Sequence, residues 1–492
     1  MFDKIKQLTK DTAIYGVSTI IGRFLTFLLV PFYTNIFAPA DYGVVANLYI
    51  FIAILNIIYI FGMDAAYLKF ASSRSSESAK DNFSTPFLSV LVAAAFLSVA
   101  ILLVKANINS ILEIPENYFH LLNYVSAILF VDSLCVIPFI KLRIERKAKK
   151  FAWYKIINIC TNVFFNLSLV LYYGWGIEAV FVSNLIASLL TLIIFLPDIF
   201  RNIRLVINIS LLQRLLRFGL PYLPAGLASM LIQGIDRPIL SKLTDLGTVG
   251  IYNANYKLGI FMMLVVNMFQ YAWQPFFLQQ AEQENAKKLF SKVLTYFTFA
   301  ASIILVLVSL FIDDIVKINF WGVYLIGLEY WSGLVIVPII LFGYLFNGLY
   351  VVFTAGIYIK EKSIYVPLIT GISALVNIAV NLLLIPPLGI VGAALATLAS
   401  YISLAGGLYI VTQKFYKIDY ELKKVLLLFA SIILIGAIYY WLLANGWLSI
   451  MTKFLLLVSF LTISVLITFD KNEIDALKKR ILKLNQNKSH PS

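Results

Sequence analysis

Five ionisable side chains stand inside apolar stretches that are long enough to cross a membrane. They are Arg23, Asp132, Asp236, Arg237 and Lys257. An ionisable group at the centre of a bilayer costs about 2.5–3.5 kcal/mol on insertion scales, so each one needs a specific reason to be there. We expect these five side chains to line a shared, water-filled cavity that receives a charged substrate.

The residue types leave two interpretations for each of the three isolated charges. Arg23 is either a donor to a phosphate group of an anionic substrate or the structural partner of an acid such as Asp132. Lys257 is either a second phosphate contact or the counter-ion of Asp236. Asp132 is either a proton-carrying acid or the partner of Arg23.

A further set of polar residues has the chemistry of a cation site. Asn377 and Asn381 are four residues apart, so their amide groups lie on one face of a helix. Thr397 and Asp236 add a hydroxyl and a carboxylate if their helices adjoin. Oxygen ligands of this kind suit a hard cation such as Na⁺, whereas the alternative is hydrogen bonding between helices.

Membrane-spanning helices must position these residues, because the composition excludes a water-soluble protein. Of 492 residues, 61% are hydrophobic and 13% charged, whereas roughly a quarter are charged in soluble domains. The predicted fold class is an all-α polytopic membrane protein with about fourteen transmembrane helices. The predicted spans are 11–36, 42–63, 83–104, 119–140, 152–173, 177–199, 217–240, 248–277, 290–312, 331–358, 364–385, 389–412, 424–444 and 447–469.

The basic residues indicate the orientation of these spans. Lys and Arg give the chain a net charge of +14, and most of them fall in alternate connections, which places both the N and the C terminus in the cytoplasm. The charge therefore reports topology rather than a nucleic-acid partner. With two Cys and two His, and with short connections between the spans, we expect neither an enzyme nor a bound cofactor.

Several residue pairs recur in the two halves of the chain. They are Pro31 and Gly43 with Pro238 and Gly250, at an offset of 207 residues, and Asn162 and Asn166 with Asn377 and Asn381, at an offset of 215. These offsets predict a six-span unit used twice in the same orientation, related by an axis along the membrane normal, as in transporters with two lobes. The predicted domains are an N-lobe over 1–200, an interfacial amphipathic linker over 201–216, a C-lobe over 217–415, spans 13 and 14 over 416–469 and a basic amphipathic cytoplasmic tail over 470–492.

The order of these spans and motifs is similar to that of a known family. The carrying residues are Gly22-Arg23-Phe24, Pro31-Phe32-Tyr33-Thr34, Ala40-Asp41-Tyr42-Gly43, Asp236-Arg237 and Gly250-Ile251-Tyr252. With the arrangement of six, six and two spans, they resemble the Wzx-type polysaccharide flippases of the multidrug/oligosaccharidyl-lipid/polysaccharide exporter superfamily, which are related to lipid II flippases.

The resemblance implies a function and a cellular setting. Such a protein moves undecaprenyl-pyrophosphate-linked oligosaccharides from the inner to the outer leaflet of the bacterial cytoplasmic membrane by ion-coupled alternating access. The product serves cell-surface polysaccharides such as O-antigen or capsule, and the implied partners are the polymerase and glycosyltransferases of the same pathway. The alternatives are a lipid II flippase and a multidrug or cation antiporter of the same superfamily.

The resemblance also assigns roles to individual residues. It implies that Arg23 and Lys257 hold the pyrophosphate, and that the basic contact of the second span is either absent here or replaced by Asn47. Arg237, one of the five charges expected in the cavity, is a further candidate for substrate binding. It further implies a Na⁺ site made by Asp236, Asn377, Asn381, the carbonyl of Ala393 and Thr397. Because Asn381 stands where that pattern has a carboxylate, H⁺ stays open beside Na⁺ as the coupling ion.

Overall fold

The computed structural model describes residues 27–72, 79–320 and 322–470. Twelve helices in this part of the chain are long and apolar enough to cross a membrane, or thirteen if one bent pair counts as a single span. The protein is therefore a helical, multi-pass membrane protein, as predicted. Of the first expected span, 11–36, only the helix Phe27–Ile36 lies within the described residues, so the count of fourteen and the cytoplasmic termini stay predictions.

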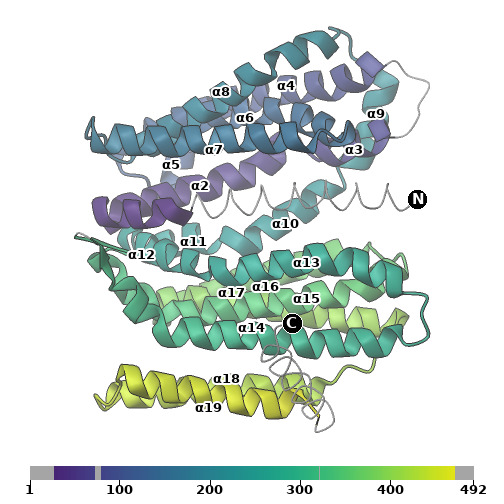
Figure 1. Cartoon of the computed structure of the whole chain (residues 1–492). Coiled ribbons are helices and arrows are strands. Elements are labelled where there is room, and N and C mark those ends of the chain that lie inside the picture. Colours follow the sequence, from purple (N-terminus) through teal and green to yellow (C-terminus); the bar gives the residue numbers. More distant parts are fainter. Residues whose placement is uncertain (1–26, 73–78, 321, 471–492) are drawn as a thin grey trace, which may run out of the picture. The chain divides into compact units, whose positions relative to one another are not determined.

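Helices make up the regular structure of the described residues, apart from one small hairpin in the loop after α14 (Figure 1). Its two strands pair antiparallel, with Asn319 opposite Tyr324. The elements are α2 Pro39–Ile60, α3 Met63–Ser72, α4 Ala79–Leu103, α5 Lys105–Leu112, η1 Glu116–Tyr118, α6 Leu121–Ile144, α7 Ala148–Leu171, α8 Glu178–Asn202, α9 Ile209–Gly219, α10 Tyr222–Gly234, α11 Asp236–Leu243, α12 Leu246–Tyr256, η2 Lys257–Gly259, α13 Ile260–Gln280, α14 Ala286–Val316, β1 Asn319–Phe320, β2 Val323–Tyr324, η3 Leu328–Ile336, α15 Val337–Ile359, α16 Tyr365–Leu388, α17 Ile390–Phe415, α18 Leu422–Ala444 and α19 Ile450–Thr468.

The chain packs as two compact units. Unit 1 comprises the described parts of Met1–Ile260, Lys317–Ile340 and Ser363–Leu404, and unit 2 those of Phe261–Val316, Leu341–Lys362 and Ala405–Ser492. Unit 1 thus combines the first half of the sequence with helices of the second half. The predicted lobe boundaries were drawn from the internal repeat of the sequence, whereas the two units are defined by packing contacts. The lobe boundaries therefore stay a prediction.

Two predicted spans are interrupted at charged residues. The span expected over 217–240 is divided into α10 and α11, and Asp236 is the first residue of α11. Pro238 lies in the first turn of α11, where a missing backbone N–H leaves no helical hydrogen bond unmade. The span expected over 248–277 is divided in the same way, because the 3₁₀ turn η2, which begins at Lys257, separates α12 from α13.

The two halves of the predicted repeat meet where α2 packs against α12, both within unit 1. These helices begin at Pro39 and Leu246, which have the same offset as Gly43 and Gly250. A Cβ atom on Gly43 would lie 1.9 Å from the carbonyl oxygen of Leu246, and one on Gly250 would lie 1.9 Å from that of Pro39. The contact is reciprocal, as a two-fold axis between the halves requires, and glycine alone permits so close an approach.

The loop between α14 and α15 is hydrogen-bonded to the end of the helix Phe27–Ile36, also within unit 1. The Asn35 side chain donates to the carbonyl of Tyr324 at 2.7 Å and accepts from its backbone N–H at 3.1 Å. The hydroxyl of Tyr330 donates to the carbonyl of Phe37 at 2.7 Å. This loop therefore holds one end of the first helix in place beside α2.

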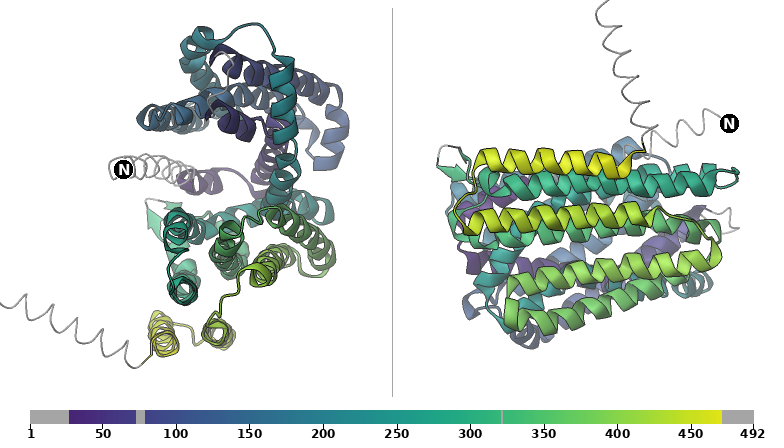
Figure 2. Two further views of the ribbon diagram at one scale, coloured as in Figure 1. Left: turned by 90° about the vertical axis from the view of Figure 1, so that its right-hand side faces the viewer. Right: turned by 90° about the horizontal axis from the view of Figure 1, so that it is seen from below.

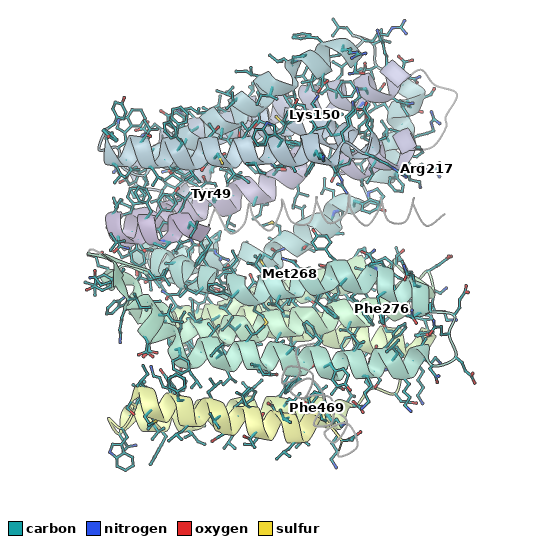
Figure 3. All side chains as sticks on the ribbon, viewed as in Figure 1. Tyr49, Lys150, Arg217, Met268, Phe276 and Phe469 are labelled. Atoms are coloured by element: carbon teal, nitrogen blue, oxygen red, sulfur yellow. The ribbon has the colours of Figure 1, made fainter. Side chains whose placement is uncertain are left out.

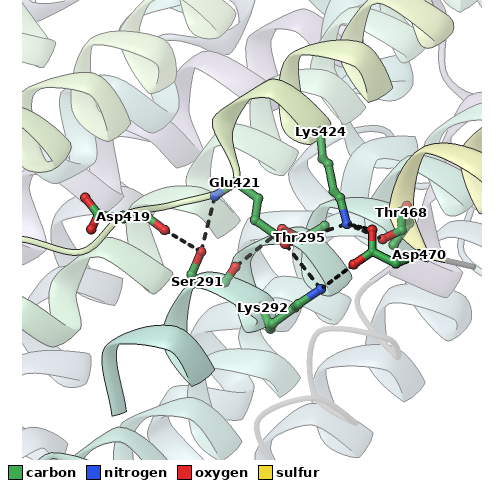
Figure 4. A network of polar contacts seen from close by, with 8 residues as sticks. All are labelled: Ser291, Lys292, Thr295, Asp419, Glu421, Lys424, Thr468 and Asp470. Atoms are coloured by element: carbon green, nitrogen blue, oxygen red, sulfur yellow. Dashed lines mark hydrogen bonds and ion pairs between the residues drawn. The ribbon is translucent and has the colours of Figure 1, made fainter. Parts of the chain in front are cut away.

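In unit 2, helices α14, α18 and α19 run side by side (Figure 2). A polar network joins the start of α18 and the end of α19 to α14 (Figure 4). Thr295 donates to the Glu421 carboxylate at 2.8 Å, and Lys424 donates to Asp470 at 3.0 Å. The hydrogen bond from Lys424 lowers the pKa of the exposed Asp470 carboxyl. The network fixes one end of the last helix pair.

A buried ammonium group fixes the other end of this pair. Lys453, in the first turn of α19, has a side chain that is only 4% exposed, and it donates to Asp313 at 2.8 Å and to Asp314 at 2.6 Å, both on α14. Replacing Lys453 by methionine should lower the free energy of unfolding by about 1–3 kcal/mol, because it leaves two carboxylates without their donor. Denaturant titration of the purified protein measures this, and the exposed Lys423→Met on α18 is the matched control. Equal unfolding midpoints for both variants would contradict the prediction.

Candidate functional site

The carboxylate of Asp236 is buried and accepts four hydrogen bonds. Its Oδ1 accepts from the backbone N–H of Arg237 at 3.0 Å and from the guanidinium of Arg237 at 2.7 Å. Its Oδ2 accepts from the hydroxyl of Tyr252 on α12 at 2.5 Å and from that of Thr397 on α17 at 3.3 Å. A carboxylate offers roughly four lone-pair positions, so every one of them has a donor.

The guanidinium of Arg237 is enclosed by the same helices. Besides Asp236, it donates to the carbonyl of Gln233 at 2.7 Å. Its carbon lies 4.1 Å from the ring centroid of Tyr256 and 5.3 Å from that of Tyr252. The side chain is 4% exposed, so in this conformation Arg237 faces its neighbouring acid and not a substrate.

The asparagine pair expected in the cation site lies on α16, against which α10 and α11 both pack. The Asn381 amide donates to the backbone carbonyl and to the side-chain oxygen of Asn377, both at 2.9 Å. Among the described residues, Oδ1 of Asn381 and Nδ2 of Asn377 have no hydrogen-bond partner. Ala393 is buried on α17. The expected residues therefore lie on adjoining helices, with Asp236 and Thr397 in direct contact.

The asparagine pair of the first half has the same geometry. On α7, the Asn166 amide donates to the carbonyl and the side-chain oxygen of Asn162, both at 3.0 Å. The remaining oxygen differs, because Oδ1 of Asn166 accepts from the hydroxyl of Tyr33 at 2.6 Å. The repeat thus extends to the geometry of these side chains. The halves differ in one acceptor, because Oδ1 of Asn381 has no hydrogen-bond donor among the described residues whereas Oδ1 of Asn166 has one.

Lys257 is half-buried, and its ammonium donates to the hydroxyl of Tyr42 on α2 at 3.0 Å. The sequence left two interpretations of Lys257, and one of them was that it is the counter-ion of Asp236. In the structure, the Asp236 carboxylate forms its ion pair with Arg237 instead. In the part of the chain that the structure describes, no carboxylate forms an ion pair with Lys257, which leaves its positive charge for another anion.

Asp132 has two polar neighbours from other helices of unit 1. Ser188 on α8 and Lys155 on α7 both interact electrostatically with its carboxyl group. Arg23, the basic partner expected from the sequence, lies outside the described residues. Lys155 therefore supplies a positive charge near Asp132, and the pairing of Asp132 with Arg23, one of its two predicted interpretations, stays untested.

Asn47 on α2 is fully buried, and its amide donates to the carbonyl of Leu112 at 3.4 Å. In this conformation Asn47 does not face an open surface that a substrate reaches. Tyr49 lies at the middle of the same helix (Figure 3), and its hydroxyl accepts a hydrogen bond from the Asn184 amide at 3.2 Å. By the repeat offset, Tyr49 corresponds to Tyr256, the tyrosine that covers the guanidinium in the second half.

Sequence reasoning missed the aromatic surroundings of these charges. Tyr42 contacts Lys257, Tyr252 contacts Asp236 and Tyr256 covers Arg237. Tyr42 and Tyr252 stand in the motifs quoted above and Tyr256 follows Tyr252 by four residues, but this spacing does not identify a charged partner. The repeat did contain a signal. The offset of 207 residues aligns Asp236 with Leu29 and Arg237 with Val30, so a charged pair stands where the first half has apolar residues.

Comparisons with known proteins agree with this architecture. The chain matches the family described as polysaccharide biosynthesis protein over residues 34–324, more than half of its length. No curated protein matches the chain in sequence.

Solved structures show the same fold. A lipid II flippase, MurJ, in an inward closed conformation is 17% identical, with a TM-score of 0.67 over 92% of this chain and 98% of that one. An inward-facing multidrug MATE family transporter of the MOP superfamily is 12% identical, with a TM-score of 0.64 over 80% of this chain and 94% of that one. The Vibrio cholerae MATE transporter VcmN, as a mutant, is 14% identical, with a TM-score of 0.57 over 83% of this chain and 97% of that one.

These matches bear on the predicted class of protein. The family concerns polysaccharide biosynthesis, and the structures that share the fold are those of a flippase and of transporters. The predicted link to polysaccharide biosynthesis and the predicted fold are confirmed. The chain belongs to the polysaccharide biosynthesis protein family and is a multi-pass membrane protein that shares its fold with a lipid II flippase and with MATE family transporters.

Proposed function

We propose that this protein flips a lipid-linked oligosaccharide across the bacterial cytoplasmic membrane. The substrate is an undecaprenyl-pyrophosphate-linked repeat unit, taken from the inner to the outer leaflet by alternating access of two lobes. The glycosyltransferases of the same pathway would deliver the substrate, and the polymerase of that pathway would receive it. The family supports polysaccharide as the product, and the fold supports a flippase.

One observation carries the choice of an anionic substrate. Lys257 stands at the interruption of its span, bound to Tyr42 of the facing half and without a carboxylate partner among the described residues. A half-buried ammonium without an acidic partner is suited to bind an anion, and a pyrophosphate supplies one. A cavity for cationic drugs would instead need an unpaired acid. Asp236 does not qualify, because Arg237 neutralises it.

Transport against a gradient requires coupling to an ion. We propose H⁺ or Na⁺ as the coupling ion. The candidates are a proton carried by Asp132 or Asp236, and Na⁺ held by Asp236, Thr397 and the oxygens of α16 and α17. Asp132 supports the first candidate because it is a carboxyl inside a membrane-spanning helix, with a hydroxyl and an ammonium as neighbours.

A lipid II flippase is the second candidate function. The fold match to MurJ favours it, and the pyrophosphate contact would be the same for both substrates. The two candidates differ in the sugar, which is a variable repeat unit in one case and the peptidoglycan precursor in the other. Parallel assays with both substrates in the same proteoliposomes therefore separate them.

The decisive experiment for this function uses the two basic residues. Arg23→Ala should abolish flipping of a pyrophosphate-linked polyprenyl oligosaccharide in proteoliposomes, whereas Arg23→Lys should restore it only partly, because lysine lacks the planar fork that matches a phosphate. Lys257→Ala should reduce flipping and Lys257→Arg should largely retain it. Full activity of both alanine variants, or uptake of organic cations without any lipid flipping, would contradict the proposal.

A further inference from the structure

The cation site implied by the resemblance already contains a cation in this chain. Arg237 follows Asp236 directly, and its guanidinium lies 2.7 Å from the carboxylate, with the two side chains 4% and 1% exposed. The pair is electrically neutral. A Na⁺ ion placed beside it would meet a fixed positive charge at close range in a medium of low dielectric constant, where such repulsion is strong.

The hydrogen bonds around Asp236 lead to the same conclusion. A metal ion needs lone pairs directed at it, but the carboxylate is surrounded by donors, namely the N–H groups of Arg237 and the hydroxyls of Tyr252 and Thr397. Oδ1 of Asn381 is the one acceptor of the asparagine pair without a partner among the described residues. The residues present therefore do not fit a Na⁺ ion while Arg237 holds this position.

The repeat shows that this charged pair is not required by packing. The corresponding residues of the first half, Leu29 and Val30, are 6% and 0% exposed. The same place in the fold is thus filled by hydrocarbon in one half and by an ion pair in the other. A buried ion pair gains little stability over apolar residues of similar volume, so a role beyond packing explains its presence.

We infer that the guanidinium of Arg237 is the resident cation of the Asp236 site and takes the place of Na⁺ in this chain. The inference narrows the proposed function, because it excludes Na⁺ at this set of residues and leaves the coupling proton. It makes Arg237 a positioning residue that fixes the Asp236 carboxylate by two hydrogen bonds and ties α11 to α12 through the rings of Tyr252 and Tyr256.

Sodium binding to the purified protein tests the inference directly. Saturable binding of radioactive sodium and the melting temperature are measured in Na⁺ and in choline at equal ionic strength. The wild type should show no saturable binding and no shift. Arg237→Gln removes the competing charge and should gain saturable sodium binding and a melting temperature that rises with Na⁺.

Two further variants make the outcome specific. Asp236→Asn with Arg237→Gln should lose the sodium response again, and the exposed Lys242→Gln on the same helix should behave as the wild type. Saturable binding by the wild type that Asp236→Asn abolishes would overturn the inference. That measurement needs no arginine variant, so it decides the question even if Arg237→Gln does not fold.

The readout is independent of the transported substrate. If the wild type flips no lipid-linked sugar but Arg237→Gln gains sodium binding, the proposed function fails and the inference stands. If the wild type flips its substrate only in the presence of Na⁺ and binds sodium through Asp236, the proposed function stands and the inference fails.

Discussion

Replacing Asp236 by alanine should lower the free energy of unfolding by about 3–5 kcal/mol, the range measured when one partner of a buried ion pair is removed. The Arg237 guanidinium would keep a single backbone acceptor, the Gln233 carbonyl, and would stay buried beside two rings. Denaturant unfolding of the purified protein in detergent measures the loss.

The repeat supplies the matching control. The double variant Asp236→Leu with Arg237→Val places the residues of the first half, Leu29 and Val30, at the corresponding positions of the second. It should recover most of the stability, because apolar replacement of a whole buried pair is often neutral or stabilising. It should also lose flipping. Wild-type flipping by this variant would show that the pair serves the fold alone.

Replacing Gly43 by alanine should force α2 and α12 apart. The new Cβ atom would lie 1.9 Å from a backbone carbonyl oxygen of the facing helix, and Gly250→Ala would create the same clash from the other side. No side-chain rotation relieves a clash with backbone. Overpacking typically costs about 1–3 kcal/mol, which shifts a two-state conformational balance about 5- to 150-fold.

Spin labels on neighbouring elements of unit 1 report this change. After Cys135 and Cys160 are replaced, labels are attached to cysteines at Glu113, the residue that follows α5, and at Lys242 on α11, whose side chains approach to 3.6 Å. The label distance should lengthen in the Gly43→Ala background. Gly371→Ala on α16 is the matched control, because its Cβ would meet no atom within 4 Å. An unchanged distance in Gly43→Ala would contradict the assigned contact.

The sequence by itself determined the membrane class, most of the spans and the repeat. Apolar runs of about 20 residues and the alternation of Lys and Arg follow from the solvent properties of the bilayer, which act locally on each segment. The i, i+4 spacing of Asn377 and Asn381 likewise follows from helix geometry, so the structure reproduces their mutual hydrogen bond. Asp236 and Thr397 were also expected together, and their hydroxyl–carboxylate contact is present.

Only the tertiary structure decided which charges neutralise each other. The sequence offered Lys257 as the candidate counter-ion of Asp236 and did not identify Arg237, because a partner in space cannot be read from spacing along the chain. With α12 and α17 beside α11, Asp236 forms its ion pair with Arg237. Lys257 instead donates a hydrogen bond to Tyr42. The cost of burying each charge and the geometry of its hydrogen bonds determine which residues pair. Both depend on contacts between helices that are far apart in the sequence.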